Sequence, residues 1–119
     1  TIYPAKPISG FVFAMSPEEK EEAARQQNAQ AADIQKTAEA IQPALTVLDE
    51  LNVALSCGMV TQENAEKLID AALAFGDVVS TGRNAPEWLR ARADYVSEIA
   101  AQKHPFETEK LAAREGIEY

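Results

Sequence analysis

The chain has little cysteine and histidine, and each shortage excludes a class of chemistry. Its single cysteine, Cys57, rules out an internal disulfide and a cysteine zinc cluster. Its single histidine, His104, leaves a Cys57–His104 dyad as one conceivable catalytic pair. We favour the simpler interpretation of a buried structural thiol and a histidine at a helix end.

Several motifs that bind phosphates or metals are also missing. The sequence holds no Gly-rich phosphate loop, no Asp-x-Asp-x-Asp-Gly calcium loop and no Glu-x-x-His pair of a metal-binding bundle. Four-apart acidic pairs such as Glu66 and Asp70 are ordinary on solvated helix faces. The sequence therefore predicts a protein that is not an enzyme, with no catalytic residues, no cofactor and no metal.

Long apolar stretches and positive charge are scarce as well. No hydrophobic run approaches the roughly 20 residues that a membrane span needs, and no secretion signal opens the chain. The expected location is the cytoplasm, or a virion if a phage encodes the protein. The net charge of −8 argues against direct binding to nucleic acid or membranes. Acidity can simply confer solubility, but it also allows a basic protein partner or the mimicry of nucleic acid.

The sequence does have a strong helical signal. Alanine is abundant and glycine sparse, which favours helix over sheet. We expect an all-α protein: a small bundle of four to five helices, with a long first helix kinked or broken at Pro43 and an extended N-terminal arm. The expected parts are an arm over residues 1–15, a bundle over 16–115 and a tail over 116–119.

The first helix has clear start signals. Ser16 suits the N-cap, Pro17 suits the first helical position, and Glu19 can complete a capping box. Small apolar residues then recur every three or four positions and form a narrow seam, as in a helix that packs closely on another helix. The seam comprises Ala24, Ala31, Ile34, Ala38, Ile41, Leu45 and Leu48. Because it keeps its phase across Pro43, a kink or a tight joint is expected there.

Further helices are expected over residues 44–57, 62–79, 85–103 and 106–114. Gly58 suits the position after the first of these, Thr61 suits the N-cap of the second, and Asn84 suits the N-cap of the third. Gly76 falls inside the predicted helix over 62–79. It should weaken that helix by up to ~1 kcal/mol relative to Ala.

Three surfaces are candidates for binding a protein partner. The first is the apolar end of the arm, which either folds back onto the helices or docks on a partner chain. The second is the seam, which either self-associates or is covered by later helices. The third is an Arg–Trp patch, since Trp and Arg are enriched at interfaces, although the Trp could instead cap the core. The predicted partner-binding residues are Phe11, Phe13, Met15, Ala31, Ile34, Ala38, Ile41, Trp88, Arg90 and Arg92.

Part of the chain resembles the C-terminal region of bacteriophage tail-fibre assembly proteins. The similar elements are Ala40-Ile41-Gln42-Pro43, a Leu-rich helix, the run Gly58-Met59-Val60-Thr61-Gln62-Glu63 and then Leu68. Trp88 and Tyr95 would stand for that family's final Trp and Tyr. Trp88 comes later than in the family, the helix before Gly58 is longer, and the family's β-rich N-terminal region is missing. The resemblance implies a chaperone that binds a fibre protein and has no catalytic residues.

The leading hypothesis from the sequence is a non-enzymatic helical module that binds a protein. Its specific form is a phage tail or virion assembly factor, or a small virion component, whose partner is a fibre protein, another virion protein or a second copy of the chain. The alternative is an inhibitor that mimics nucleic acid and blocks a nuclease or a DNA-binding protein. Its acidic surface would comprise Glu39, Asp49, Glu50, Glu63, Glu66, Asp70 and Asp77, and reversing the charges of the last four would test it.

Overall fold

The computed structural model describes residues 12–111, without the side chain of Phe106. Phe11, most of the predicted arm and the predicted tail over 116–119 lie outside the described residues. Within residues 12–111, no helix is long and apolar enough to cross a membrane.

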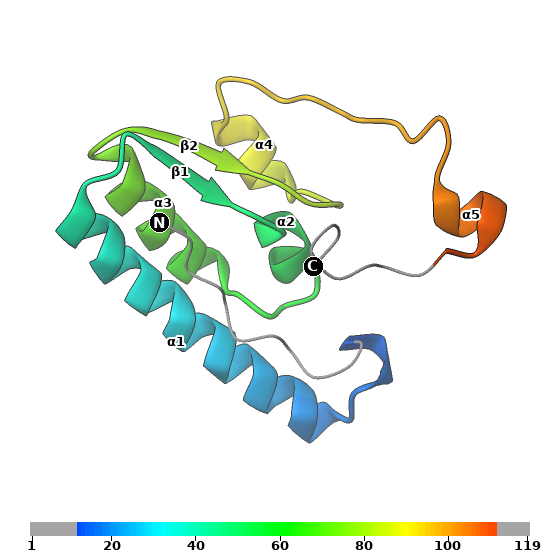
Figure 1. Ribbon diagram of the computed structural model, residues 1–119. Coiled ribbons are helices and arrows are strands. Elements are labelled where there is room, and N and C mark those ends of the chain that lie inside the picture. Colours follow the sequence, from blue (N-terminus) through cyan, green and yellow to red (C-terminus); the bar gives the residue numbers. More distant parts are fainter. Residues whose placement is uncertain (1–11, 112–119) are drawn as a thin grey trace.

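The fold is mixed, so the prediction of an all-α bundle was wrong. The elements in chain order are a 3-10 helix η1 (Val12–Ala14), α1 (Pro17–Ile41), β1 (Leu45–Leu48), α2 (Leu51–Ser56), α3 (Gln62–Leu73), β2 (Asp77–Ser80), α4 (Glu87–Arg92) and α5 (Pro105–Glu109). The two strands form a parallel pair in which Leu45 is opposite Asp77 and Leu48 is opposite Ser80 (Figure 1). The extended arm predicted up to Met15 is a 3-10 turn over its described part.

The predicted helix over 44–57 is instead a strand followed by a short helix. Leu45 to Leu48 include the β-branched Thr46 and Val47, which favour a strand. Glu50 then has a φ of 57°, a left-handed conformation that a right-handed helix cannot continue through. A short apolar run does not distinguish a buried helix from a strand by its periodicity, which explains the error.

The two later helices are also shorter than predicted. The helix α3 ends at Leu73, and the chain passes through Gly76 into β2. The helix α4 spans only Glu87 to Arg92, with Pro86 rather than Asn84 at its N-cap. Residues 93–104 contain no helix, so the predicted helix over 85–103 was largely wrong.

The signals at helix ends were read correctly in three places. The Ser16 side chain accepts a hydrogen bond from Glu19 N at 3.2 Å, and Glu19 Oε2 accepts one from Ser16 N at 2.7 Å, so the capping box is present. Thr61 caps α3, and Gly58 has the positive φ of 72° expected after a helix. However, α1 ends at Gln42, whose φ is 50°, and is not continued through a kink at Pro43.

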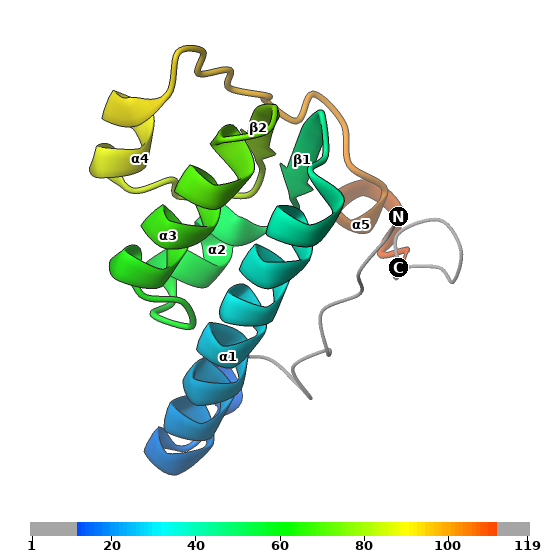
Figure 2. The ribbon, with the colours of Figure 1, turned by 90° about the vertical axis from the view of Figure 1, so that its left-hand side faces the viewer.

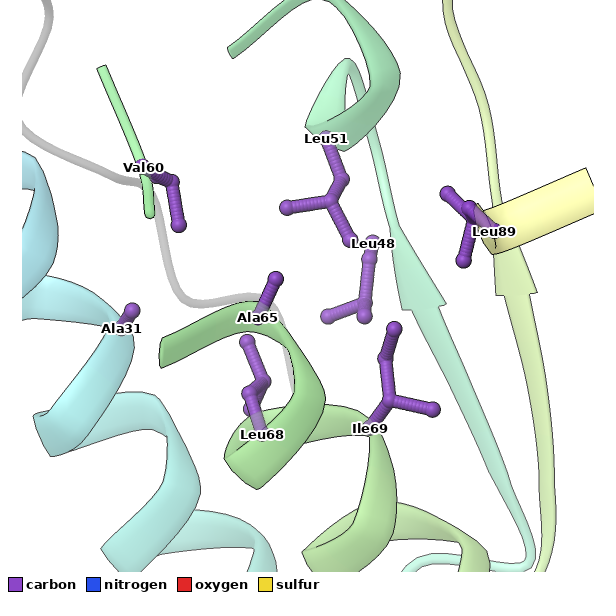
Figure 3. Packing of buried hydrophobic residues seen from close by; sticks show 8 residues of the cluster. All are labelled: Ala31, Leu48, Leu51, Val60, Ala65, Leu68, Ile69 and Leu89. Carbon is purple, nitrogen blue, oxygen red and sulfur yellow. The ribbon is translucent and has the colours of Figure 1, made fainter. Parts of the chain in front are cut away.

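The core lies between the helices and the strand pair. The helix α1 packs along α3, and α3 packs on the sheet (Figures 1 and 2). Leucines and an isoleucine from β1, α2, α3 and α4 meet Ala31 of α1 in one cluster (Figure 3). The buried members of that cluster are Ala31, Leu48, Leu51, Val60, Ala65, Leu68, Ile69 and Leu89. Alanine at Ala31 and Ala65 lets the two helices approach closely.

Asn28 ties α1 to the start of α3. Its Nδ2 donates to Met59 O at 3.2 Å, and its Oδ1 accepts from Thr61 N at 3.0 Å and from Asn64 Nδ2 at 2.8 Å. We expect Asn28→Ala to lower the free energy of unfolding by about 2 kcal/mol, because it leaves partly buried groups without partners. Urea unfolding measures this loss. The control Gln26→Ala removes only an exposed bond to Glu22 and should change stability by less than about 0.5 kcal/mol; equal losses in the two variants would contradict the assignment.

Candidate functional site

Polar residues gather where both strands end. Because β1 and β2 are parallel, their carboxyl ends lie at the same edge of the sheet. Asp49 and Glu50 follow β1 directly, and Thr81, Gly82 and Arg83 follow β2. In open α/β sheets, ligands bind outside the carboxyl ends of the strands. This edge is therefore a candidate ligand site.

A hydrogen bond joins the two strand ends. Thr81 Oγ1 donates to Asp49 Oδ1 at 2.6 Å and accepts from Glu50 N at 3.1 Å. Thr81 N donates to Leu48 O at 3.2 Å, which extends the strand pairing by one residue. The Thr81 hydroxyl thus fixes the position of the Asp49 carboxylate, while Asp49 and Glu50 both remain exposed to solvent.

Asn52 holds the loop after β2 against α2. It is buried, with 7% of its surface exposed. Its Nδ2 donates to Gly82 O at 3.2 Å, its Oδ1 accepts from Ser80 Oγ at 3.0 Å, and its backbone N donates to Thr81 O at 3.1 Å. Asn52 therefore binds the last residue of β2 and the first two residues of the following loop.

Two backbone conformations at this edge are unusual. Gly82 has a φ of 117°, and a Cβ atom there would lie 3.2 Å from Asn52 Cβ, so glycine suits the position on both counts. Glu50 adopts a φ of 57°, which is uncommon for a residue other than glycine. Such conformations concentrate at functional sites. Glu50 and its neighbour Asp49 are both exposed and follow directly on the end of β1.

The carboxylates of Asp49 and Glu50 suit a metal ion that is also bound by the phosphates of a substrate. Within residues 12–111, no group of three or more His, Cys, Asp or Glu could hold a metal ion unaided. Magnesium does not need such a cage, because it commonly binds one or two carboxylates together with the phosphates of a substrate. Asp49 and Glu50 supply that donor set.

The predicted seam packs largely inside the chain. Ala31 and Ala38 are buried, Ile34 is partly buried against the core, and Ile41 is 50% exposed at the end of α1. In the arm, Phe13 is 83% exposed; Met15 is partly buried, and Phe11 lies outside the described residues. The part of these residues in partner binding stays a prediction.

The predicted Arg–Trp patch and the single cysteine also lie elsewhere. Trp88 packs against the core, Arg90 pairs with Glu87, and Arg92 pairs with Asp70. Their role at an interface likewise stays a prediction. Cys57 is exposed at the end of α2, so the expectation of a buried thiol was wrong.

Neighbouring side chains bind some of the negatively charged carboxylates on α3. Lys67 Nζ donates to Glu63 Oε1 at 2.6 Å, and this hydrogen bond, with the charge of Lys67, lowers the pKa of Glu63 below its usual value. Glu66 accepts from Gln62 Nε2 at 2.8 Å. In the surface proposed to mimic nucleic acid, Glu63, Glu66 and Asp70 therefore have partners.

The residues at the sheet edge were missed by the sequence interpretation. The available signal was a repeated pattern of β-branched residues followed by polar ones, as in LTVL-DE and DVVS-TG. Two such runs joined by helices indicate a parallel β-α-β unit. Asp49, Glu50, Asn52, Thr81 and Gly82 would have followed as site candidates from that interpretation.

Comparison with known proteins gives a consistent assignment. The family model described as ATP:corrinoid adenosyltransferase BtuR/CobO/CobP matches residues 2–119. A corrinoid adenosyltransferase of Pseudomonas aeruginosa is 39% identical over 75 residues, which are 63% of this chain and 36% of that protein. One from Sinorhizobium sp is 37% identical over 76 residues, or 63% of this chain and 35% of that protein. The chain thus spans about a third of the length of these relatives, and no solved structure matches it.

These matches overturn the functional predictions from the sequence. The resemblance to phage tail-fibre assembly proteins was wrong, as were the assembly factor and the nucleic-acid mimic that followed as hypotheses. The prediction of a non-enzymatic protein was wrong too, because the matching family is one of transferases. The helix punctuation on which the resemblance relied is shared by unrelated helical segments. The chain belongs to the ATP:corrinoid adenosyltransferase family BtuR/CobO/CobP.

Proposed function

We propose that this chain forms part of an ATP:corrinoid adenosyltransferase, and that Asp49 and Glu50 bind the magnesium ion carried by the triphosphate of ATP. The observation that carries the proposal is the hydrogen bond between Thr81 Oγ1 and Asp49 Oδ1 across the two strand ends. It holds an exposed carboxylate at the edge of a parallel sheet where nucleotide ligands bind. The family name supplies the substrates, ATP and a corrinoid.

The proposed roles follow from the chemistry of the transfer. When the adenosyl group of ATP passes to a corrinoid, the bond to the triphosphate breaks and the triphosphate leaves as a polyanion. A magnesium ion held by Asp49 and Glu50 would stabilise that charge. Thr81 and Asn52 keep the two strand ends together. Preorganisation of this kind avoids rearrangement during the reaction.

Thr81 tests this arrangement as a positioning residue. In the full-length protein, Thr81→Val removes the hydroxyl while keeping the shape of the side chain. We expect about a 10-fold fall in kcat/KM and a higher magnesium concentration for half-maximal rate, because the Asp49 carboxylate is no longer held. Initial rates of corrinoid adenosylation, measured over a magnesium titration, give both quantities.

Two further variants separate this role from a general structural one. Thr81→Ser keeps the hydroxyl and should restore most of the rate. Thr37→Val makes the same chemical change in α1, where the hydroxyl bonds only to Asp33 O of its own helix, and should leave the kinetics unchanged. An unaltered magnesium dependence in Thr81→Val would refute the assignment.

A further inference from the structure

The side chain of Asn52 lies at a buried position that an apolar residue would usually occupy. Among residues 12–111, Asn52 is the only buried residue that is polar. It directly follows Leu51, a member of the core cluster, in the first turn of α2. Burying an amide costs free energy unless hydrogen bonds replace those to water, and replacing a buried hydrogen-bonded pair by apolar groups can leave stability unchanged. Stability alone therefore does not explain an amide at this position.

The hydrogen bonds of Asn52 enclose Thr81. Asn52 Oδ1 accepts from Ser80 Oγ at 3.0 Å on one side of Thr81, and Asn52 Nδ2 donates to Gly82 O at 3.2 Å on the other side. The backbone N of Asn52 donates to Thr81 O at 3.1 Å. One residue of α2 thus binds Thr81 and both of its neighbours in the chain.

The chain needs such a contact here because the strand ends at this point. The last residue of β2 is Ser80, and Thr81 N then donates to Leu48 O at 3.2 Å. Gly82 follows with a φ of 117°. Glycine adopts positive and negative φ about equally readily, so its own backbone preference does not hold this conformation. The hydrogen bond from Asn52 Nδ2 to Gly82 O holds it instead.

The backbone at Thr81 decides where its hydroxyl points. A threonine hydroxyl occupies one of a few staggered positions about χ1, and the backbone conformation selects among them. Thr81 Oγ1 donates to Asp49 Oδ1 at 2.6 Å and accepts from Glu50 N at 3.1 Å. Both hydrogen bonds need the hydroxyl in the same position, so a rotation at Thr81 breaks both of them.

We propose that Asn52 is a positioning residue for the candidate magnesium site and that it acts through Thr81 on the carboxylate of Asp49. By binding the residues on both sides of Thr81, it keeps the Thr81 hydroxyl directed at Asp49. This role needs no contact between Asn52 and ATP or the metal ion. The inference rests on the proposed function, because the position of Asp49 affects the reaction only if Asp49 binds magnesium.

Kinetics of single and double variants test whether Asn52 acts through Thr81. We expect Asn52→Ala to lower kcat/KM about 10-fold and to raise the magnesium concentration for half-maximal rate, as Thr81→Val does. The double variant should also lose about 10-fold, because both changes release the same carboxylate, whereas independent effects would multiply to about 100-fold. A 100-fold loss in the double variant overturns the proposal. An unaltered magnesium dependence in Asn52→Ala overturns it too if Thr81→Val does alter that dependence.

Asn28→Ala is the matched control for lost stability. Asn28 is also an asparagine whose side chain joins two parts of the fold, but it connects α1 to the start of α3. Its magnesium dependence should equal that of the unaltered protein, and a shift as large as that of Asn52→Ala would contradict the proposal. If Asn52→Ala does not fold, Ser80→Ala removes one of the two side-chain bonds and should lower kcat/KM about 3-fold. Unchanged kinetics in Ser80→Ala would then overturn the proposal.

The rotamer of Thr81 gives a readout that does not depend on activity. Three-bond NMR couplings to the Thr81 methyl carbon report χ1. We expect a single rotamer in the unaltered protein and in Asn28→Ala, and a mixture of rotamers in Asn52→Ala. A single, unchanged rotamer in Asn52→Ala overturns the proposal. A mixture of rotamers in Asn52→Ala, combined with an unaltered magnesium dependence in Thr81→Val, supports the positioning of Thr81 by Asn52 and refutes only the proposed magnesium site.

Discussion

Under the proposed function, Asp49→Asn is expected to lower the adenosyltransferase kcat/KM at least ~100-fold while leaving the fold intact. The amide oxygen can still accept the hydrogen bond from Thr81 Oγ1, so the strand ends stay joined. It carries no charge, however, and is a much weaker ligand for magnesium than a carboxylate. Losing a group that stabilises charge in the transition state typically costs about 100- to 1000-fold in rate. Initial rates with ATP, magnesium and a corrinoid measure the loss.

The matched control for this change is Asp77→Asn. Asp77 is also an exposed aspartate of the strand pair, but it lies at the start of β2, at the opposite end of the sheet. It should retain the full rate, because only the carboxyl edge is proposed to meet ATP. An active Asp49→Asn, or an equal loss in Asp77→Asn, would remove Asp49 from the proposed site.

Gly76→Ala is expected to destabilise the protein by about 3 kcal/mol or more, the size of a severe overpacking error. A Cβ atom at Gly76 would lie 2.2 Å from Ala44 O and 2.4 Å from Ala44 C. Ala44 O accepts the hydrogen bond from Asp77 N that begins the strand pairing, so neither side of the clash can move without breaking it. Urea unfolding followed by the fluorescence of Trp88, the single tryptophan, measures the change.

Gly58→Ala is the control variant, because it adds backbone strain without a steric clash. Gly58 has a φ of 72°, but no atom lies within 4 Å of a Cβ placed there. We expect a loss of about 1 kcal/mol, the usual cost of a left-handed residue other than glycine. If Gly76→Ala proved stabilising, Gly76 would behave as the sequence interpretation assumed, as a defect inside a helix, and the strand pairing at Ala44 would be wrong.

Gly76 shows how a local pattern can mislead. Ala65, Leu68, Ile69 and Ala72 do form the buried face of α3, but Val79, which continued the same spacing, belongs to β2 and is 45% exposed. Periodicity cannot reveal where a helix stops when the following strand is short and apolar. The close approach of Gly76 to Ala44 is a contact between segments 32 positions apart, which no local window contains.

The sequence interpretation missed the candidate site for a related reason. Asp49 and Thr81 are also 32 positions apart, and each looks ordinary in its own surroundings. Their meaning depends on β1 and β2 being parallel neighbours, because only then do both strands end at one edge. Once LTVL was interpreted as helix, Asp49 and Glu50 became two more exposed acids on a helical surface.

The sequence by itself determined the features whose energetics are local. The capping box at Ser16, the cap at Thr61 and the turn at Gly58 depend on side chains and backbone within about four residues, so they were predicted correctly. Only the tertiary structure decided which apolar runs became strands, because a strand is stabilised by a partner distant in the chain and a helix by its own hydrogen bonds. The joining of Asp49 to Thr81 at one edge of the sheet follows from that pairing.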